Sequence, residues 1–343
     1  MISFRKIAKI ALILVYLVII AGAVVRMTGS GMGCPDWPKC FGYYIPPTEA
    51  SALEWKPNKE FKKGQVIILN KTLQVAKEHT TTGTNFNEEN WEQYTKHDYA
   101  IFNPWHTWIE YINRLLGALA GLATLVLAFA SIRYWKTKKQ ITVLSCLVVL
   151  GMGFQAWLGA TVVYSVLEPV KITTHMLMAL LIVAFLLFII FKVNKEDKKI
   201  TYDKTTLIIA IVALVLTIVQ VILGTQVRQF VDHQIDLVGE NAKNLWLQNP
   251  TFKFYFHRSF SIAIVAINSL LAHRIITLKL GHAKIFWILA ILVIEISSGI
   301  AMYYLDFPFA SQPLHLVLAS VLFGIQFYLV LDALKPKKNL KTS

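Results

Sequence analysis

The sequence predicts an all-α polytopic membrane protein, with eight transmembrane helices arranged as two parallel four-helix-bundle repeats. Hydrophobic residues make up 55% of the 343 residues and charged residues only 16%, which is typical of a membrane protein rather than of soluble domains. Apolar runs follow one another along the chain, each close to the roughly 20 residues that a helix needs to cross a bilayer. The predicted spans are residues 10–27, 107–131, 141–164, 172–192, 205–227, 255–277, 285–305 and 313–334.

The distribution of basic residues predicts how the chain lies in the bilayer. A net charge of +14 would suit a nucleic-acid-binding protein. The Lys and Arg residues are, however, concentrated in alternate loops, before the first span and after the second, fourth, sixth and eighth. This is the positive-inside pattern. We therefore expect no nucleic-acid partner, and a multi-pass protein in the lipid bilayer of the cell (inner) membrane with both termini cytoplasmic.

The second half of the chain repeats the first. The first span ends in Gly22-Ala-Val-Val-Arg26 and the fifth in Gly224-Thr-Gln-Val-Arg228. Both units begin in the cytoplasm, so the repeat is parallel and each unit could hold a ligand of similar shape. We expect a first unit over residues 1–200, including a long outer loop at about 28–106, and a second unit over residues 201–343. Further pairs, each 140 residues apart, are Gln155 and Glu295, Gly159 and Gly299, Tyr164 and Tyr304, and His175 and His315.

The loop after the first span begins with Gly- and Pro-rich turns and continues as a polar insertion. Residues from about 48 to 100 are rich in Lys, Glu, Asn and Thr, with one amphipathic segment around Glu60–Lys77 and no catalytic pattern. We expect this insertion to be a solvated loop.

Cys34 and Cys40 lie in the sequence GCPDWPKC, just after the first span and on the predicted oxidising face of the membrane. A disulfide that closes a small loop suits this location. A redox-active dithiol and a metal site are the alternatives, and the sequence does not decide between a structural and an exchanging disulfide. Cys146 lies inside the third span, where we expect an unreactive thiol in the core.

Three histidines stand at the predicted outer ends of spans that run inward: His175, His257 and His315. Imidazoles on different helices of one bundle suit a haem iron, and no carboxylate-rich triad accompanies them to favour a non-haem metal. Pairing with a backbone carbonyl or a proton relay is the alternative for any one of them. Four arginines near the same ends could bind haem propionates or reach lipid phosphates, namely Arg26, Arg114, Arg228 and Arg258.

His106, Glu110 and Asn113 are spaced to share one face of the second helix. A carboxylate that enters a membrane is costly unless it is paired or used, so Glu110 is the candidate catalytic residue. Its place in the second unit is taken by Phe254 when the Asn-Arg and His-Arg pairs of the two units are aligned. We therefore expect the second unit to hold iron and the first to carry out a reaction.

Together these residues resemble the haem A synthase family of bacteria and mitochondria. The matching features are VRMTGSGMGCPDWPKC after the first span, Glu110-Tyr111 with Arg114, His175 in the fourth span, His257-Arg258 in the sixth and His315 in the eighth. The resemblance covers all the predicted spans and leaves only the insertion at about 48–100 unmatched.

The resemblance implies a membrane oxidoreductase that converts the C8 methyl group of haem O to the formyl group of haem A for cytochrome oxidase. It implies a haem b on His257 and His315, and haem O in the first unit on His175, with Glu110 as acid or proton relay. It also implies a cysteine pair at Cys34 and Cys40. The implied partners are haem O, the farnesyltransferase that makes it and an electron donor, whereas the donor's identity and a homo-oligomeric state stay open.

Asn113 departs from the family pattern, because many members read Glu-x-x-His-Arg where this chain reads Glu110-Tyr-Ile-Asn113-Arg114. An amide is a poor iron ligand, so His175 is the one matched ligand of that unit. We hypothesise that His106 replaces the missing histidine or that the iron is five-coordinate.

Two other functions compete with the synthase. A di-haem b-type electron-transfer protein predicts two bis-histidine sites, and a small-molecule transporter predicts polar groups at the bilayer midplane.

Overall fold

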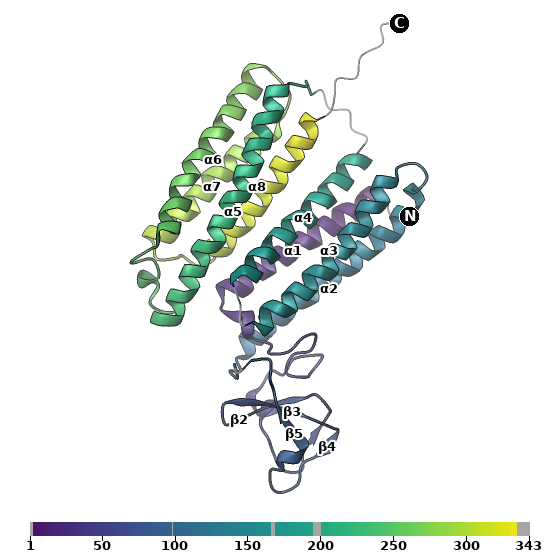
Figure 1. The fold of residues 1–343 in the computed structure, drawn as a ribbon, viewed down its shortest axis with the longest axis vertical. Coiled ribbons are helices and arrows are strands. Elements are labelled where there is room, and N and C mark those ends of the chain that lie inside the picture. Colours follow the sequence, from purple (N-terminus) through teal and green to yellow (C-terminus); the bar gives the residue numbers. More distant parts are fainter. Residues whose placement is uncertain (1–2, 98, 166–168, 195–199, 335–343) are drawn as a thin grey trace. The chain divides into compact units, whose positions relative to one another are not determined.

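A computed structural model of the chain describes residues 3–97, 99–165, 169–194 and 200–334 (Figure 1). It confirms the predicted all-α membrane class, because eight helices in these ranges are long and apolar enough to cross a membrane. Except at the start of α1 and the end of α5, the helices begin and end close to the predicted span limits. They are α1 (Phe4–Met27), α2 (Pro104–Ser131), α3 (Lys139–Tyr164), α4 (Pro169–Val193), α5 (Lys204–Val238), α6 (Phe252–Thr277), α7 (Lys284–Tyr304) and α8 (Ser311–Ala333).

The chain divides into two compact units. One unit comprises the described residues of Met1–Ile13, Ala123–Val149 and Met176–Ser343, and the other comprises those of Leu14–Leu122 and Leu150–His175. The first contains the whole of α5–α8, and the second contains the C-terminal part of α1, the N-terminal part of α2 and everything between them.

Helices α5–α8 pack as one bundle in which α5 and α7 each contact both α6 and α8. Their shared core is apolar, with Leu271, Ile285 and Ile288 almost fully buried. At one end, Arg274 Nε donates to Asp203 Oδ2 over 2.9 Å, which ties the start of α5 to the end of α6. The Arg274 guanidinium holds the pKa of the Asp203 carboxyl well below its usual value. The bundle therefore combines an apolar interior with ion pairs at its ends.

Helix α5 continues to Val238, well beyond the predicted span end at residue 227. The extension is amphipathic: Arg228 pairs with Asp232 one turn later over 2.7 Å, while Val231 is buried against Trp246 and Phe307. The helix ends at Gly239, whose φ of +90° stops it. Hydropathy alone does not predict these additional helical turns, because the exposed face of the extension is polar.

The polar insertion folds into a small β region, so the predicted solvated loop is wrong for this part of the chain. Two antiparallel sheets form within it, and their side chains contribute to two apolar clusters, one with the fully buried Phe61 and Ile67 and the other with Val66 and Leu73. Strand β1 (Glu60–Phe61) pairs with β4 (Thr80–Thr81), and the second sheet has the order β2 (Val66–Leu69), β3 (Thr72–Ala76), β5 (Trp91–Gln93).

The amphipathic segment Glu60–Lys77 is a hairpin rather than one continuous element. β2 and β3 pair with Leu69 opposite Thr72, and the connecting residues Asn70 and Lys71 have φ angles of +49° and +61°. Two consecutive left-handed residues are the signature of a type I′ turn, whose twist suits paired strands. Asn70 tolerates the left-handed conformation, but the Asn-Lys pair lacks the glycine that usually marks such a turn in a sequence.

Cys146 is a free thiol on an exposed face of α3, so its expected place in the core is wrong. In a bilayer such a face meets lipid, which is as apolar as a protein core, and hydropathy therefore does not distinguish the two positions.

Replacing Trp91 by Ala should loosen the β region. Trp91 packs its ring against Phe61 with centroids 5.1 Å apart, and truncating a buried aromatic residue typically costs about 3–5 kcal/mol. Limited proteolysis of the purified protein should then cleave faster within residues 48–100. Glu92→Ala, an exposed change on the same strand, is the matched control, and equal cleavage of both variants would contradict this packing.

Candidate functional site

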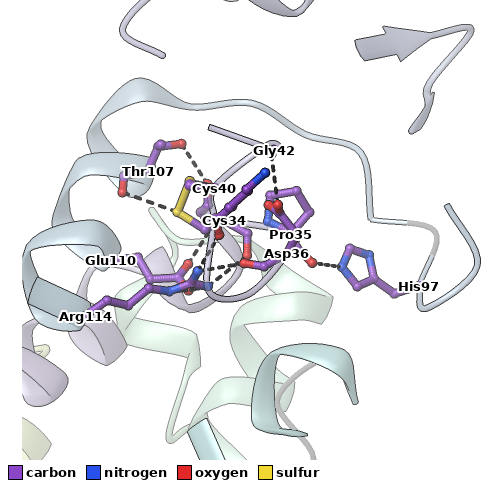
Figure 2. Close-up of a disulfide and its surroundings, with 11 residues drawn as sticks. Cys34, Pro35, Asp36, Cys40, Gly42, His97, Thr107, Glu110 and Arg114 are labelled. Carbon is purple, nitrogen blue, oxygen red and sulfur yellow. Dashed lines mark hydrogen bonds and ion pairs between the residues drawn. A yellow bond between two sulfur atoms is a disulfide. The ribbon is translucent and has the colours of Figure 1, made fainter. Parts of the chain in front are cut away.

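Glu110 and Arg114 form a buried ion pair on α2 (Figure 2). Glu110 is 4% exposed, and its Oε1 accepts hydrogen bonds from both Nε and Nη2 of Arg114. The two residues are four apart and so lie on the same face of the helix. A carboxylate and a guanidinium that would each be costly alone in an apolar segment therefore compensate each other.

The same pair holds the loop closed by the Cys34–Cys40 disulfide, which the structure contains as predicted. The backbone N–H of Cys34 donates to Glu110 Oε2 over 2.8 Å. Arg114 Nη1 donates to the carbonyls of Asp36 and Lys39 at 2.6 and 2.9 Å, and Nη2 donates to the carbonyl of Cys34 at 3.2 Å. One guanidinium thus binds three carbonyls of a single small loop (Figure 2).

Gly33 lets this loop lie directly on the backbone of α2. A Cβ at Gly33 would lie 2.4 Å from the carbonyl oxygen of His106 and 2.7 Å from the backbone nitrogen of Thr107. Thr107 completes the contact, because its Oγ1 donates to the Gly33 carbonyl over 2.7 Å. The disulfide loop therefore packs on the first turn of α2, which includes His106.

The other side of the loop rests on the end of the β region. Tyr94 OH and His97 Nε2 both donate to the carbonyl of Pro35, at 2.8 and 2.9 Å. Asp36 turns inward and accepts from the backbone N–H of Gly42 over 2.8 Å. Burial raises the pKa of the Asp36 carboxyl, although the Gly42 N–H and Arg114 oppose this shift. The insertion thus contributes directly to the position of the disulfide loop.

Each candidate haem ligand lies against a glycine of the neighbouring helix. A Cβ built at Gly22 of α1 would lie 3.9 Å from Asn113 Oδ1, and one at Gly224 of α5 would lie 3.2 Å from His257 Cε1. The other two pairs have the same form, with Gly159 against His175 at 3.7 Å and Gly299 against His315 at 3.7 Å. These glycines leave room for a side chain that lies flat on the adjacent helix.

His257 and His315 face each other inside the α5–α8 bundle. Their ring centroids are 6.4 Å apart and their planes are inclined by 72°. The Nδ1 atom of His257 is buried without a hydrogen-bond partner among the described residues, as is that of His175. The backbone carbonyls of these two histidines instead accept from Gln220 and Gln155, at 3.1 and 2.9 Å.

The four candidate arginines differ in their surroundings. Arg114 is occupied by Glu110 and the disulfide loop, as described above. Arg228 pairs with Asp232 and donates to Gln312 Oε1. Arg258 is exposed, with its guanidinium 5.3 Å from the ring centroid of Tyr255, and Arg26 is partly buried in the last turn of α1. The structure therefore engages these arginines in different ways, from a fully enclosed guanidinium to an exposed one.

Comparison with known proteins places this architecture in a family. The family model COX15-CtaA, described as cytochrome oxidase assembly protein, matches residues 5–327. The chain belongs to this family. That match spans all the site residues described above, from the loop of the disulfide to His315, and it confirms the resemblance to haem A synthases.

Curated relatives resemble the chain over most of its length. Proteins named Heme A synthase from Ehrlichia canis and Rickettsia prowazekii are 25% and 24% identical, each over 92% of this chain and over 89% and 93% of their own length. A protein of the same name from Shewanella oneidensis is 22% identical over 88% of this chain and 87% of its own.

Two contacts among the candidate site residues are not evident from the sequence. The bond from Cys34 to Glu110 joins residues 76 apart, and no periodicity links a loop to a helix over that distance. Glu295 and Ser298 lie within 2.8 and 2.9 Å of His315 Nδ1. Only the 140-residue displacement between Gln155 and Glu295 points to that position.

Gly33→Ala should displace the disulfide loop from the backbone of α2. The added methyl group would collide with the backbone of α2, and overpacking of this kind typically costs about 1–3 kcal/mol. The thermal unfolding midpoint of the purified protein should fall. Gly117→Ala, at a helical glycine where an added methyl group would meet nothing within 4 Å, should leave the midpoint unchanged or raise it slightly. A Gly33→Ala midpoint equal to that of Gly117→Ala would refute the close approach.

Proposed function

We propose that this protein is a haem A synthase, which oxidises the C8 methyl group of haem O to a formyl group and so makes haem A for cytochrome oxidase. The observation that carries this proposal is a pair of facing, half-buried histidines in a chain whose relatives, over nearly their full length, are named Heme A synthase. The fold, with eight apolar helices, suits a substrate that is itself apolar.

In the α5–α8 bundle, His257 and His315 would hold a haem b. Their ring centroids lie 6.4 Å apart, which leaves space for an iron between them, since each metal–imidazole bond is roughly 2 Å long. Gly224 leaves the space that the His257 ring occupies. A bound haem b supplies one-electron chemistry. The protein residues would contribute the two imidazoles, in a bundle whose core is apolar.

The other four helices provide the place for haem O. His175 lies against Gly159 as His315 lies against Gly299, which supports His175 as the ligand of the substrate iron. Asn113 lies against Gly22 where the second half of the chain has His257 against Gly224. This correspondence supports the parallel repeat of two four-helix units. By this correspondence Asn113 takes the place that His257 has in the second half, with His106 two turns earlier as the alternative ligand.

Glu110 is our proposed catalytic residue, as acid or proton relay to the substrate. It lies one turn from Asn113 on the same helix, and it is the sole acidic residue of α2. Its Oε1 accepts hydrogen bonds from Arg114 and its Oε2 accepts one from the backbone N–H of Cys34, so the seated disulfide loop contacts the carboxylate directly.

Arginines complete the proposed sites as partners for the haem propionates. Arg258 directly follows His257 on α6, and Arg26 lies in the last turn of α1, shortly before the disulfide loop. Arg228 lies on α5, the helix before that of His257, and Arg114 lies on α2, the helix after that of Arg26. A guanidinium binds a carboxylate through two parallel hydrogen bonds. For Arg114 and Arg228, such binding would add to or replace the contacts already described.

We place the protein in the inner membrane with both termini cytoplasmic, because basic residues cluster in alternate loops. The disulfide loop and β region then lie on the oxidising side, where a disulfide persists. The enzyme that attaches the farnesyl group to haem is the natural source of the substrate, and a separate electron donor is required.

Analysis of extracted haems tests the function directly. The chain should be expressed in cells that make haem O but lack their own haem A synthase, and the haems should be identified by mass. We expect haem A or its hydroxylated intermediate, together with haem b in the purified protein. Haem O without either product would contradict the proposed activity.

Glu110→Ala should keep haem b and lose the product, because the residue lies in the unit that we assign to the substrate. The same extraction should show at least a roughly tenfold fall in haem A, in line with the loss of a general acid or base. Glu240→Ala removes an exposed acid elsewhere and should leave the yield unchanged. A normal haem A yield from Glu110→Ala would remove this residue from the mechanism.

A further inference from the structure

Glu295 of α7 contacts the imidazole of His315 on α8. Its Oε2 lies 2.8 Å from His315 Nδ1, and its side chain is only 11% exposed. The other carboxylate oxygen, Oε1, is buried with no hydrogen-bond partner among the described residues. The imidazole is therefore the group that compensates this carboxylate within the bundle.

The surrounding hydrogen bonds fix which ring nitrogen carries the proton. Ser298 Oγ lies 2.9 Å from the same Nδ1, but its hydrogen is donated to the carbonyl of Glu295 over 2.8 Å. Both neighbours of Nδ1 therefore act as acceptors, so Nδ1 must bear the hydrogen. In the neutral imidazole this leaves Nε2 without a hydrogen, which is the form that binds a metal.

The other two candidate ligands lack this arrangement. The Nδ1 atoms of His175 and His257 have no partner among the described residues. Gln155, which is 140 residues before Glu295, donates to the backbone carbonyl of His175 rather than to its ring. The two halves of the chain thus differ at this position in charge and in the atom that is contacted.

We infer that Glu295 is a positioning residue that lowers the reduction potential of the haem held by His257 and His315. The inference rests on the proposed function. A carboxylate that accepts the Nδ1 hydrogen makes the imidazole a stronger electron donor through Nε2. A stronger donor stabilises ferric over ferrous iron, so the haem in this bundle is more reducing than one whose histidines lack the contact.

Redox titration of the haem b absorption band in the purified protein tests the role. Glu295→Gln keeps the size and an amide oxygen but removes the charge, and the midpoint potential should shift upward. The electron paramagnetic resonance g-values of the ferric haem should move in the direction of a weaker imidazole donor. Ser298→Ala removes the second acceptor and should give a smaller upward shift.

Ser297→Ala is the matched control, because Ser297 is exposed on the same helix and bonds to the carbonyl of Val293 rather than to the ring of His315. An unchanged potential and unchanged g-values in Glu295→Gln, with haem b retained, would overturn the inference. A residue that merely joined α7 to α8 would lower thermal stability without moving either reading. If Glu295→Gln fails to retain haem, Ser298→Ala decides, and an unshifted potential there overturns the inference.

A separate variant distinguishes failure of the proposed function. His315→Ala should lose the haem b spectrum if this histidine is an axial ligand. Full retention of that spectrum would reject the haem site itself, whereas loss of the spectrum with an unshifted Glu295→Gln potential rejects only the role of Glu295.

Discussion

The buried ion pair of Glu110 and Arg114 determines the position of the segment that follows α1. Removing one partner of such a pair typically costs about 3–5 kcal/mol, because the other is left charged and uncompensated. Here the structural consequence would extend further, since Arg114 also binds three carbonyls of the disulfide loop and Glu110 binds the N–H of Cys34. The same two residues thus hold the disulfide loop, which lies outside the helices, against α2.

A shared framework and divergent side chains characterise the two candidate haem sites. Glycines at matching positions leave room for a ligand side chain in each of four places. On this framework, Asn113 stands where the other site has His257, and Gln155 stands where it has Glu295. One site therefore presents two imidazoles, one of them held by a carboxylate, and the other presents a single matched histidine, with an acid one turn from Asn113. Such a difference suits stable haem binding at the site with two imidazoles and substrate turnover at the site with the acid.

Much of the fold can be predicted from the sequence because long apolar runs have few structural outcomes. Span limits, the disulfide pair and the candidate ligands all follow from hydropathy, charge, repeated spacing and the family resemblance. The β region escapes prediction because its strands are short and polar on one face, and its turn at Asn70 and Lys71 lacks the usual glycine. The contact between Cys34 and Glu110 escapes prediction because it depends on how a loop returns to a helix 76 residues later.

The two sites are proposed to hold different haems, and separate loss of each haem tests this assignment most directly. His175→Ala and His315→Ala should be purified side by side from cells that make haem O, and their haems should be extracted and identified by mass. We predict that His175→Ala retains haem b but loses haem O and haem A, and that His315→Ala loses haem b. Loss of the same haem from both variants would contradict the assignment of a different haem to each site.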